Sequence, residues 1–391
     1  MSEAIRKAQK DGKCNWIRQN EPEIWRKTHK FLQVSGFLNF RLTRRFADSL
    51  ASQIGHIPFN YKKTRWAQIG ELNSLLFPVE KEKLPELVAP GNVLGKVCAE
   101  AASETGLPAG CPVIACGSDK GCETIGMGVI DESMASLSFG TTATVQTTSR
   151  RYYEPLKFMP AYPAPIPGCF NPEVEIFRGY WMITWFKNEF GYKEVLEAEK
   201  NGLAPEQMLN RLLARVPAGS LGLMVQPYWG PGLKHSAAKG SILGFGDVHT
   251  RAHIYRAVIE GLAYALLDGL HKIEKAGKIK VREVAVSGGA SQSDEICQIS
   301  ADIFNLPLHR GRTFETAGLG AAIITAVGLR IYSDFAEAIA GMVTSERIFE
   351  PDPEHARLYR KLYRRVYLKI FQATNNLYKE IRDITGYPEK A

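Results

Sequence analysis

The sequence predicts an α/β fold, because segments typical of strands alternate with segments typical of helices after residue 280. Residues 281–304 indicate a strand, a glycine turn and a helix, and residues 316–327 indicate a further helix of small side chains. The bulk numbers agree with this class. A chain of 391 residues suggests two domains or one large one, and 45% hydrophobic with 23% charged residues is typical of a globular protein.

Local patterns in the first half of the chain predict helices and a hairpin. The first hundred residues predict mainly helices rich in aromatic side chains, followed by a loop-like stretch over residues 90–109. Residues 134–148 have two β-favouring arms around Gly140, which predicts a hairpin. Residues 180–191 have the apolar spacing of a helix.

Further elements are expected between residues 221 and 304. Residues 221–232 indicate a strand that runs into a loop. An apolar stripe over residues 253–275 predicts a helix, with Gly277 as its C-cap. Ser291, with Asp294 three residues later, fits a capping box at the start of the next helix.

The C-terminal part predicts two more helices. Ser333 is expected to be the N-cap of the first. In the second, Leu358, Leu362, Val366 and Ile370 recur every four residues, whereas the arginines lie mostly elsewhere around the helix. We interpret it as a helix packed on its domain with a solvated basic face. The alternative is a surface that binds an anionic or groove-bearing partner.

Charge and cysteine content limit the class of partner and compartment. Lys and Arg exceed Asp and Glu by 49 to 41, and no zinc-finger or RNA-binding signature occurs, so no nucleic-acid partner is expected. Seven cysteines without metal-ligand spacing predict reduced thiols and no metal site. The first residues lack the apolar core of a secretory signal, and residues 317–329 are too short to span a bilayer. The sequence therefore predicts a soluble cytoplasmic protein.

Two glycine-rich segments have the character of anion-binding turns. Gly288 and Gly289 end a predicted strand before a helix, so a ligand can approach the backbone and phosphate can meet the helix N–H groups. The alternative is that these glycines serve turn geometry alone. Gly140 is followed by Thr141 and Thr142, whose hydroxyls add donors to a turn, although a plain hairpin would look the same.

Asp119 follows an apolar run and precedes a predicted helix, in the stretch "GSDKGCETIGMGV". A carboxylate in this position can accept a proton from a hydroxyl if it lies in a cleft, and otherwise it is an N-cap. Together, a base and two phosphate-facing turns are the parts of a phosphoryl-transfer site. No Walker A sequence or protein-kinase motif set occurs, so those two classes are excluded.

The order of these motifs resembles that of the FGGY carbohydrate kinases, which belong to the actin-like ATPase superfamily. The resemblance is carried by "NWIRQNEPEIWRKTHKFLQVSGFLNFRLT", "GSDKGCETIGMGV", "SFGTTATV", "AVSGGASQSDEICQISADIFNLPL" and "ETAGLGAAIITAVGLRIYSDFAEA". It implies an actin-like ATPase (ribonuclease H-like) fold of two domains with the first one incomplete. Residues 1–129 would be the remnant of an N-terminal sugar-binding kinase domain, and residues 130–391 the C-terminal nucleotide-binding kinase domain.

The resemblance also implies a reaction and its partners. Asp119 would deprotonate a hydroxyl of a small sugar or polyol, which attacks the γ-phosphate of ATP bound with Mg²⁺. The residues implied to bind the nucleotide and its transferred phosphate are Gly140, Thr141, Thr142, Gly288, Gly289 and Ser293. Kinases of this kind often form dimers, so a homodimer is a further expectation.

Two departures from the family pattern affect the expected activity. Lys120 and Glu123 replace the family's usual amide and small residue, so Lys120 is expected either to bind an anionic group on the substrate or to pair with Glu123. The family's opening phosphate loop, Asp-x-Gly-Thr, does not occur in the sequence. We therefore expect an N-terminally truncated kinase. The alternatives are an inactive nucleotide-binding remnant or half of a split kinase, and an actin-like ATPase with an assembly or regulatory role.

Overall fold

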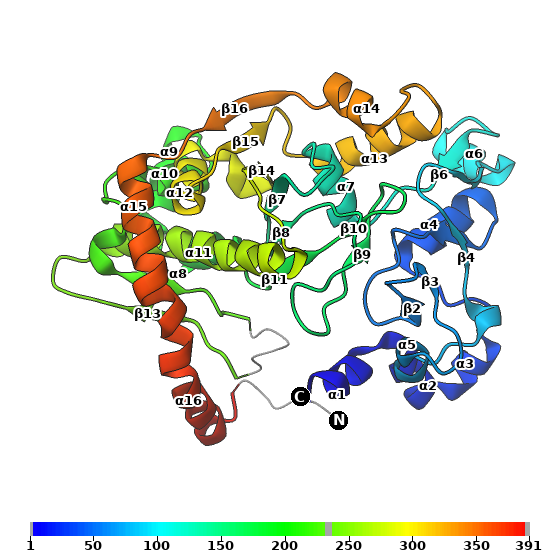
Figure 1. The fold of residues 1–391 in the computed structure, drawn as a ribbon, viewed down its shortest axis with the longest axis horizontal. Helices are drawn as coiled ribbons and strands as arrows, with labels where there is room; N and C mark the ends of the chain where they lie inside the picture. Colours follow the sequence, from blue (N-terminus) through cyan, green and yellow to red (C-terminus); the bar gives the residue numbers. More distant parts are fainter. Residues whose placement is uncertain (1–2, 231–236, 388–391) are drawn as a thin grey trace.

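A computed structural model of the chain describes residues 3–230 and 237–387 (Figure 1). The helices, with three short 3₁₀ segments (η1–η3) and one π segment (η4), are α1 Glu3–Asp11, α2 Lys13–Asn20, α3 Pro22–Lys27, α4 Val34–Thr43, α5 Leu72–Leu76, η1 Lys81–Lys83, α6 Ala99–Thr105, α7 Asp119–Gly126, α8 Trp181–Phe190, α9 Tyr192–Asn201, α10 Pro205–Leu213, η2 Ser220–Gly222, α11 Arg251–Gly277, η3 Gly289–Gln292, α12 Asp294–Phe304, α13 Thr316–Gly328, α14 Phe335–Met342, α15 Pro353–Leu362, η4 Tyr363–Tyr367 and α16 Leu368–Thr385.

Most of the described strands have two to four residues, and β7, β14 and β16 are longer. The strands are β1 Ala47–Ser49, β2 Phe59–Asn60, β3 Arg65–Trp66, β4 Glu86–Val88, β5 Val93–Lys96, β6 Pro112–Ile114, β7 Met134–Phe139, β8 Ala143–Gln146, β9 Tyr162–Pro163, β10 Phe170–Asn171, β11 Glu173–Ile176, β12 Met224–Gln226, β13 Ser241–Leu243, β14 Glu283–Ser287, β15 Leu308–Gly311 and β16 Ser345–Phe349.

A six-stranded mixed sheet in the order β11-β8-β7-β14-β15-β16 forms the centre of the fold. β7, β14 and β15 run parallel, whereas β8, β11 and β16 extend the sheet in antiparallel pairing. The predicted hairpin is confirmed as β7 and β8, and the predicted strand, turn and helix after residue 280 are confirmed as β14, η3 and α12. β12 confirms the predicted strand of residues 221–232, although positions 231 and 232 lie outside the described residues.

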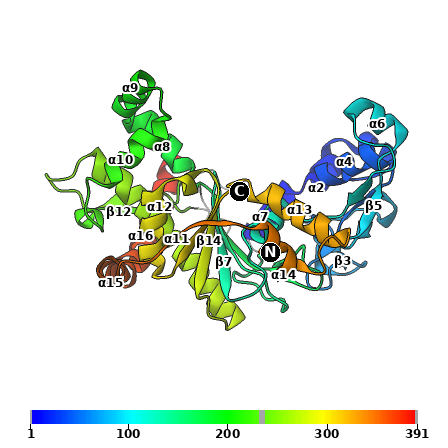
Figure 2. The ribbon, with the colours of Figure 1, turned by 90° about the horizontal axis from the view of Figure 1, so that it is seen from above.

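The two faces of this sheet differ in polarity. Side chains alternate along a strand, and Leu137, Val145 and Val174 point to the face that packs on α11, where Gly269 lies directly against Val145 and Val174. The opposite face carries buried polar side chains, namely Ser136, Ser138, Thr144, Gln146 and Ser287. Helices α7 and α13 lie on this polar side, and α11 and α12 lie on the apolar side (Figure 2). One face of the sheet therefore builds the core, and the other is a surface of hydrogen-bonding groups.

The part of the chain before α7 is less regular than the sequence predicted. Helices α1 to α4 confirm the helical prediction for residues 3–43, but residues 47–96 contain five short strands in two-stranded pairings with little helix. Prolines recur through this stretch, at positions 58, 78, 85 and 90. Proline lacks a backbone N–H group and so interrupts both helices and sheets.

Helices α7 and α13 touch through their backbones. A Cβ atom added to Gly126 of α7 would overlap the carbonyl oxygen of Thr316, and one added to Gly320 of α13 would overlap the carbonyl oxygen of Cys122. At its other end, α13 meets the turn before β5, where Gly328 lies against the backbone of Gly91. α13 therefore spans from the central sheet to the N-terminal part of the chain (Figure 2).

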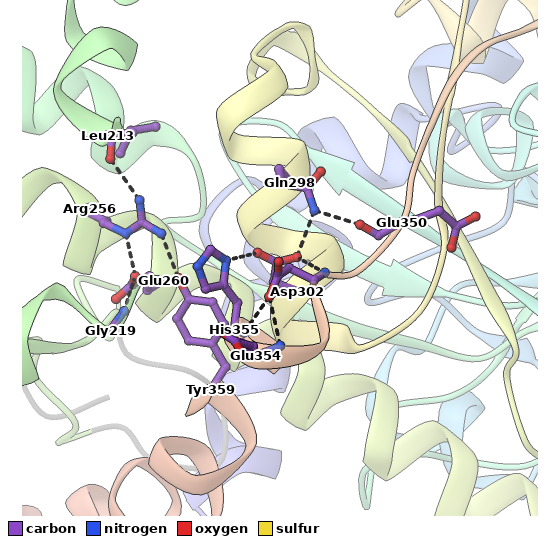
Figure 3. Close-up of polar contacts among 11 residues, drawn as sticks. Leu213, Gly219, Arg256, Glu260, Gln298, Asp302, Glu350, Glu354, His355 and Tyr359 are labelled. Atoms are coloured by element: carbon purple, nitrogen blue, oxygen red, sulfur yellow. Dashed lines mark hydrogen bonds and ion pairs between the residues drawn. The ribbon is translucent and has the colours of Figure 1, made fainter. Parts of the chain in front are cut away.

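The C-terminal helices are attached to the core by buried polar contacts (Figure 3). Arg256 and Glu260 of α11 form an ion pair at 2.8 Å, and the hydroxyl of Tyr359 on α15 donates to Glu260 at 2.7 Å. A second contact joins His355 of α15 to Asp302 of α12 at 2.9 Å. These contacts fix α15 across α11 and α12.

The buried face of the C-terminal helices matches only part of the one that the leucine spacing predicted. Leu358 and Val366 are exposed, whereas Tyr359, Tyr363 and Tyr367 are buried against the core. The hydroxyls of Tyr359 and Tyr363 donate to Glu260 and Asp268, so these side chains suit a partly polar interface better than an aliphatic side chain would. The prediction of a packed helix is confirmed. Its predicted contact face is right only in part, because Ile370 belongs to the core and Leu362 packs against it.

Two predicted helix caps were also wrong. Gly277 is the last residue of α11 and Lys278, at φ 51°, is its C-cap. Gly277 has a packing role, because an added Cβ would clash with the ring of Tyr153. At α14 the N-cap is Asp334, whose carboxylate accepts a backbone N–H, and not Ser333.

The seven cysteines, all within the described ranges, carry free thiols. No described helix has the length and apolarity to cross a membrane.

Candidate active site

Two of the three predicted site segments are in direct contact. Gly288, at φ 89°, lies against the β7–β8 turn, so that an added Cβ would lie 2.8 Å from the carbonyl carbon of Phe139 and 3.1 Å from the nitrogen of Gly140. Because β7 and β14 are neighbouring parallel strands, their carboxyl ends lie at the same edge of the sheet. The turns that were expected to hold phosphate and nucleotide therefore form one continuous surface.

Asp119 is the first residue of α7, and it does not act as the helix cap. Ser118 fills that role, because its Oγ accepts the backbone N–H of Gly121 at 3.1 Å. The Asp119 side chain is exposed, and its Oδ1 accepts the N–H of Lys120 at 2.8 Å. The alternative interpretation of Asp119 as an N-cap is therefore wrong, and its carboxylate lies at the positive end of the helix.

Lys120 and Glu123 connect α7 to the ends of the two central strands. The Lys120 ammonium pairs with Glu123 Oε2 at 2.7 Å and donates to Ser138 Oγ on β7 at 2.8 Å. The hydroxyl of Ser287 on β14 donates to the other oxygen of Glu123. Of the two roles that the sequence left open for Lys120, the pairing with Glu123 is present.

Two glutamates that sequence reasoning missed lie beside this group. Glu173 and Glu175 are on β11, on the polar face of the sheet, and both are partly buried. Burial, reinforced by the charge of Glu175, raises the pKa of Glu173 to about 8. Burial also raises the pKa of Glu175, and the Lys120 ammonium opposes that rise. The alternating sequence Glu-Val-Glu-Ile was the available signal, since it predicts a strand with both carboxylates on one face.

The β7–β8 turn is supported by a segment that the sequence did not connect with it. Tyr180 donates its backbone N–H to the carbonyl of Gly140 at 3.0 Å, and Gly179 packs against the backbone of Ala143. Thr141 is exposed, and Thr142 is partly exposed. Both threonines are thus accessible to a ligand, while Gly179 and Tyr180 contact the two ends of the turn.

Two of the predicted nucleotide-binding residues in the β14–α12 turn have different surroundings: Gly289 faces open space, whereas Ser293 caps a helix. An added Cβ on Gly289 would meet no atom within 4 Å, so a ligand can approach the backbone there. Ser293 is the N-cap of α12, and its Oγ accepts the N–H of Ile296 at 3.3 Å and donates to Glu295 at 2.8 Å. The predicted capping box at Ser291 was wrong, because the 3₁₀ turn η3 moves the start of the helix two residues on.

A protein-held metal centre would need several ligands close together. Within residues 3–230 and 237–387, no group of three or more His, Cys, Asp or Glu side chains is arranged to hold a metal ion. A Mg²⁺ ion that enters with a nucleotide requires less, because phosphate oxygens and water supply most of its ligands.

Both halves of the chain match models of one protein family. Residues 7–126 match the N-terminal domain of the FGGY family of carbohydrate kinases, and residues 135–329 match its C-terminal domain. These two matches do not support the predicted N-terminal truncation.

Curated relatives are carbohydrate kinases that are longer than this chain. The "Uncharacterized sugar kinase YgcE" of Escherichia coli (strain K12) is 31% identical over 90% of this chain and 71% of its own length. A xylulose kinase of Lactococcus lactis is 28% identical over 95% of this chain and 71% of its own length.

Solved structures share the fold at lower identity. A gluconate kinase from Lactobacillus acidophilus superposes with a TM-score of 0.81 at 23% identity, covering 96% of this chain and 73% of that chain. A ligand-bound xylulose kinase from Lactobacillus acidophilus superposes with a TM-score of 0.77, also at 23% identity, covering 96% and 72% respectively. These likenesses confirm the predicted actin-like ATPase fold.

Proposed function

Because the chain belongs to the FGGY family of carbohydrate kinases, we propose that Asp119 acts as the general base in phosphoryl transfer from ATP to a neutral sugar or polyol. The family establishes the class, an ATP-dependent carbohydrate kinase, and it does not favour the nucleotide-binding remnant or the actin-like assembly ATPase. The identity of the base, the binding residues and the substrate chemistry are the parts that we propose.

The observation that carries the proposal is that Asp119 starts helix α7, which contacts the strands leading into the two glycine turns. Its neighbour Lys120 hydrogen-bonds Ser138, which lies two residues before Gly140. One turn further along α7, Glu123 accepts the hydroxyl of Ser287, which directly precedes Gly288. The exposed Asp119 carboxylate therefore starts a helix that is hydrogen-bonded, through Lys120 and Glu123, to the strands that lead into both turns. A proton acceptor for phosphoryl transfer is needed near such turns.

The two turns offer hydroxyl groups and accessible backbone that could bind a nucleoside triphosphate. The hydroxyls of Thr141 and Thr142 and the backbone of Gly140 would hold the transferred phosphate. Gly288 and Gly289 would lie against the nucleotide, since Gly289 leaves open space above its backbone. The N-terminus of α12, which Ser293 caps, favours negative charge. Mg²⁺ bound to the phosphates would neutralise the charge that develops on transfer.

The charges around Asp119 favour a neutral substrate. The Lys120 ammonium is already paired with Glu123, and Glu173 and Glu175 add acidic groups from β11. An ammonium carries three donors, of which two are used here, so Lys120 can still donate to a substrate hydroxyl. A sugar acid would meet the carboxylates of Asp119 and Glu123 here, and the cation beside them, Lys120, is already paired. The domain boundary at residues 129–130, the cytoplasmic location and the homodimer remain predictions.

The test is ADP release by the purified chain with Mg-ATP over a panel of polyols, ketoses and sugar acids. We expect turnover that depends on a neutral substrate and falls about 10²- to 10⁴-fold in Asp119→Asn. The same variant should keep the rise in melting temperature that ATP causes, because the nucleotide turns are intact. Sugar-independent ATP hydrolysis would favour the assembly ATPase. Stabilisation by ATP without turnover on any substrate would favour the nucleotide-binding remnant.

A further inference from the structure

Ser138 and Ser287 form a matched pair at the edge of the sheet. They are direct partners in the parallel pairing of β7 with β14. Each is among the last residues of its strand, immediately before the turn that contains Gly140 or Gly288. Both hydroxyls point to the polar face, because each contacts a side chain of α7.

Lys120 and Glu123 engage this pair from one turn of α7. Residues three apart lie on the same side of a helix, and these two are ion-paired at 2.7 Å. Lys120 contacts Ser138, and Glu123 contacts Ser287. We name these four residues the Lys120–Glu123 clamp. Its two contacts on two strands fix the rotation of α7 and its height above the sheet at the start of the helix, and Thr124, which contacts Ser136 and Gln146, adds a contact further along.

The ion pair of the clamp is largely buried, and such a pair specifies an arrangement of side chains more than it adds to stability. The side chains of Lys120 and Glu123 are 29% and 12% exposed, so both have lost most of their hydration. The attraction within a buried pair often does little more than offset this desolvation cost, and such pairs are attested as devices that specify a unique arrangement. The opposite side of the helix is also confined, by the ring of Pro165 against Gly121.

We propose that Glu123 is a positioning residue, which holds Lys120 and thereby keeps Asp119 aligned with the phosphate and nucleotide turns. The inference rests on the function proposed above. Asp119 directly precedes Lys120 and starts the helix, so any rotation of α7 moves its carboxylate relative to Gly140. The clamp also sets the charge around the base, because the ion pair keeps Lys120 from acting as an uncompensated cation.

The experiment compares Lys120→Gln, Glu123→Gln and the double variant for kcat, KM and the pH dependence of kcat/KM. Each single variant should lower kcat about 10²-fold, as expected for misplacement of a catalytic group by about 1 Å. KM for ATP should change little. Lys272→Gln is the matched control, because Lys272 also pairs with an acid of its own helix, at 2.6 Å, but lies on α11. It should leave all three quantities unchanged.

The pH profiles separate positioning from general structural damage. The titratable groups near Asp119 are Lys120 and Glu123 on α7 and Glu173 and Glu175 on β11, and burial raises the pKa of Glu173 to about 8. Lys120→Gln removes a positive charge and so leaves a net negative charge near Asp119. The acid limb of the kcat/KM profile should therefore move to higher pH by about 0.5 to 1 pH unit. Glu123→Gln leaves an extra positive charge and should move it the other way. The double variant restores the net charge and should return the limb toward that of the wild type, while kcat stays low.

Hydrogen–deuterium exchange gives a second readout that needs no turnover. Glu123→Gln should speed amide exchange in residues 119–126 while the sheet strands keep their protection. Single variants with wild-type kcat, pH profile and exchange would overturn the proposal. A Lys120→Gln variant that only raises KM for the sugar would show Lys120 to be a binding group without a positioning partner. Loss of the proposed function is distinct, because it would appear as full activity in Asp119→Asn.

Discussion

Gly288 and Gly289 are adjacent in the sequence, and the structure gives them opposite requirements. Gly288 has φ 89° and ψ 167°, a conformation that is almost confined to glycine and costs other residues about 1–3 kcal/mol. In Gly288→Ala the new Cβ would also lie 2.8 Å from a backbone carbon of Phe139. That contact is shorter than van der Waals distance, so the β7–β8 turn would have to shift.

We expect Gly288→Ala to lower the free energy of unfolding by about 2 kcal/mol, from the middle of the backbone range alone. For a domain of this size, about 2–4 °C of melting temperature corresponds to each kcal/mol, so the melting temperature should fall by about 4–8 °C. Thermal melts followed by circular dichroism, with and without Mg-ATP, measure this. Stabilisation by ATP should also be lost, because the displaced turn is the expected phosphate site.

Gly289→Ala is the control that distinguishes turn geometry from ligand approach. No atom lies within 4 Å of the added Cβ, so the free energy of unfolding should stay within about 0.5 kcal/mol of wild type. The stabilisation by ATP should nevertheless shrink, since the methyl group occupies space that the nucleotide needs. Equal melting temperatures for Gly288→Ala and the wild type would refute the strain argument. An unchanged response of Gly289→Ala to ATP would refute the role of Gly289 in binding.

Three further substitutions test other parts of the fold. Glu173 has its pKa raised from 4.5 to about 8, so between these pH values the folded protein holds a proton that the unfolded chain has lost, and stability falls as pH rises. Glu173→Gln should therefore gain more melting temperature over wild type at pH 9 than at pH 5, and a constant difference would contradict the shift. Tyr359→Phe removes a hydroxyl that contacts both Arg256 and Glu260, and should cost about 1–3 kcal/mol in urea unfolding; a change below about 0.5 kcal/mol would show that this contact is dispensable. Gly320→Ala forces a Cβ into a carbonyl oxygen of α7 and should lower kcat as well as the melting temperature, whereas wild-type values of both would argue against tight α7–α13 packing.

The parts of the fold that were predictable are those whose signals are local. The hairpin around Gly140 and the β14–α12 unit follow from alternation, glycine and apolar spacing within a few residues. The start of α12 was misplaced at Ser291 because an intervening 3₁₀ turn leaves no distinct pattern in the sequence. The strands of residues 47–96 were missed because strands of two to four residues are too short to show a period.

The candidate site was predictable in its residues but not in its arrangement. Asp119, Gly140 and Gly288 carry recognisable motifs, and the structure brings their segments together. Glu173 was missed because its relation to α7 depends on β11 pairing with β8, a contact that no local pattern encodes. The contact of Lys120 with Ser138, which lies 18 residues away in the chain, is likewise encoded by no local pattern.

The backbone contact between α7 and α13 has a consequence for how the sequence of α13 can vary. Residues 316–328 look interchangeable, since nearly all are small or aliphatic. Gly318 faces open space and could accept a side chain, whereas Gly320 and Gly328 abut carbonyl groups of other segments and could not. Tolerance to mutation should therefore change sharply between positions two residues apart. A saturation mutagenesis library of this helix would therefore identify the positions where α13 packs against α7 and against Gly91. The composition of the helix does not distinguish these positions.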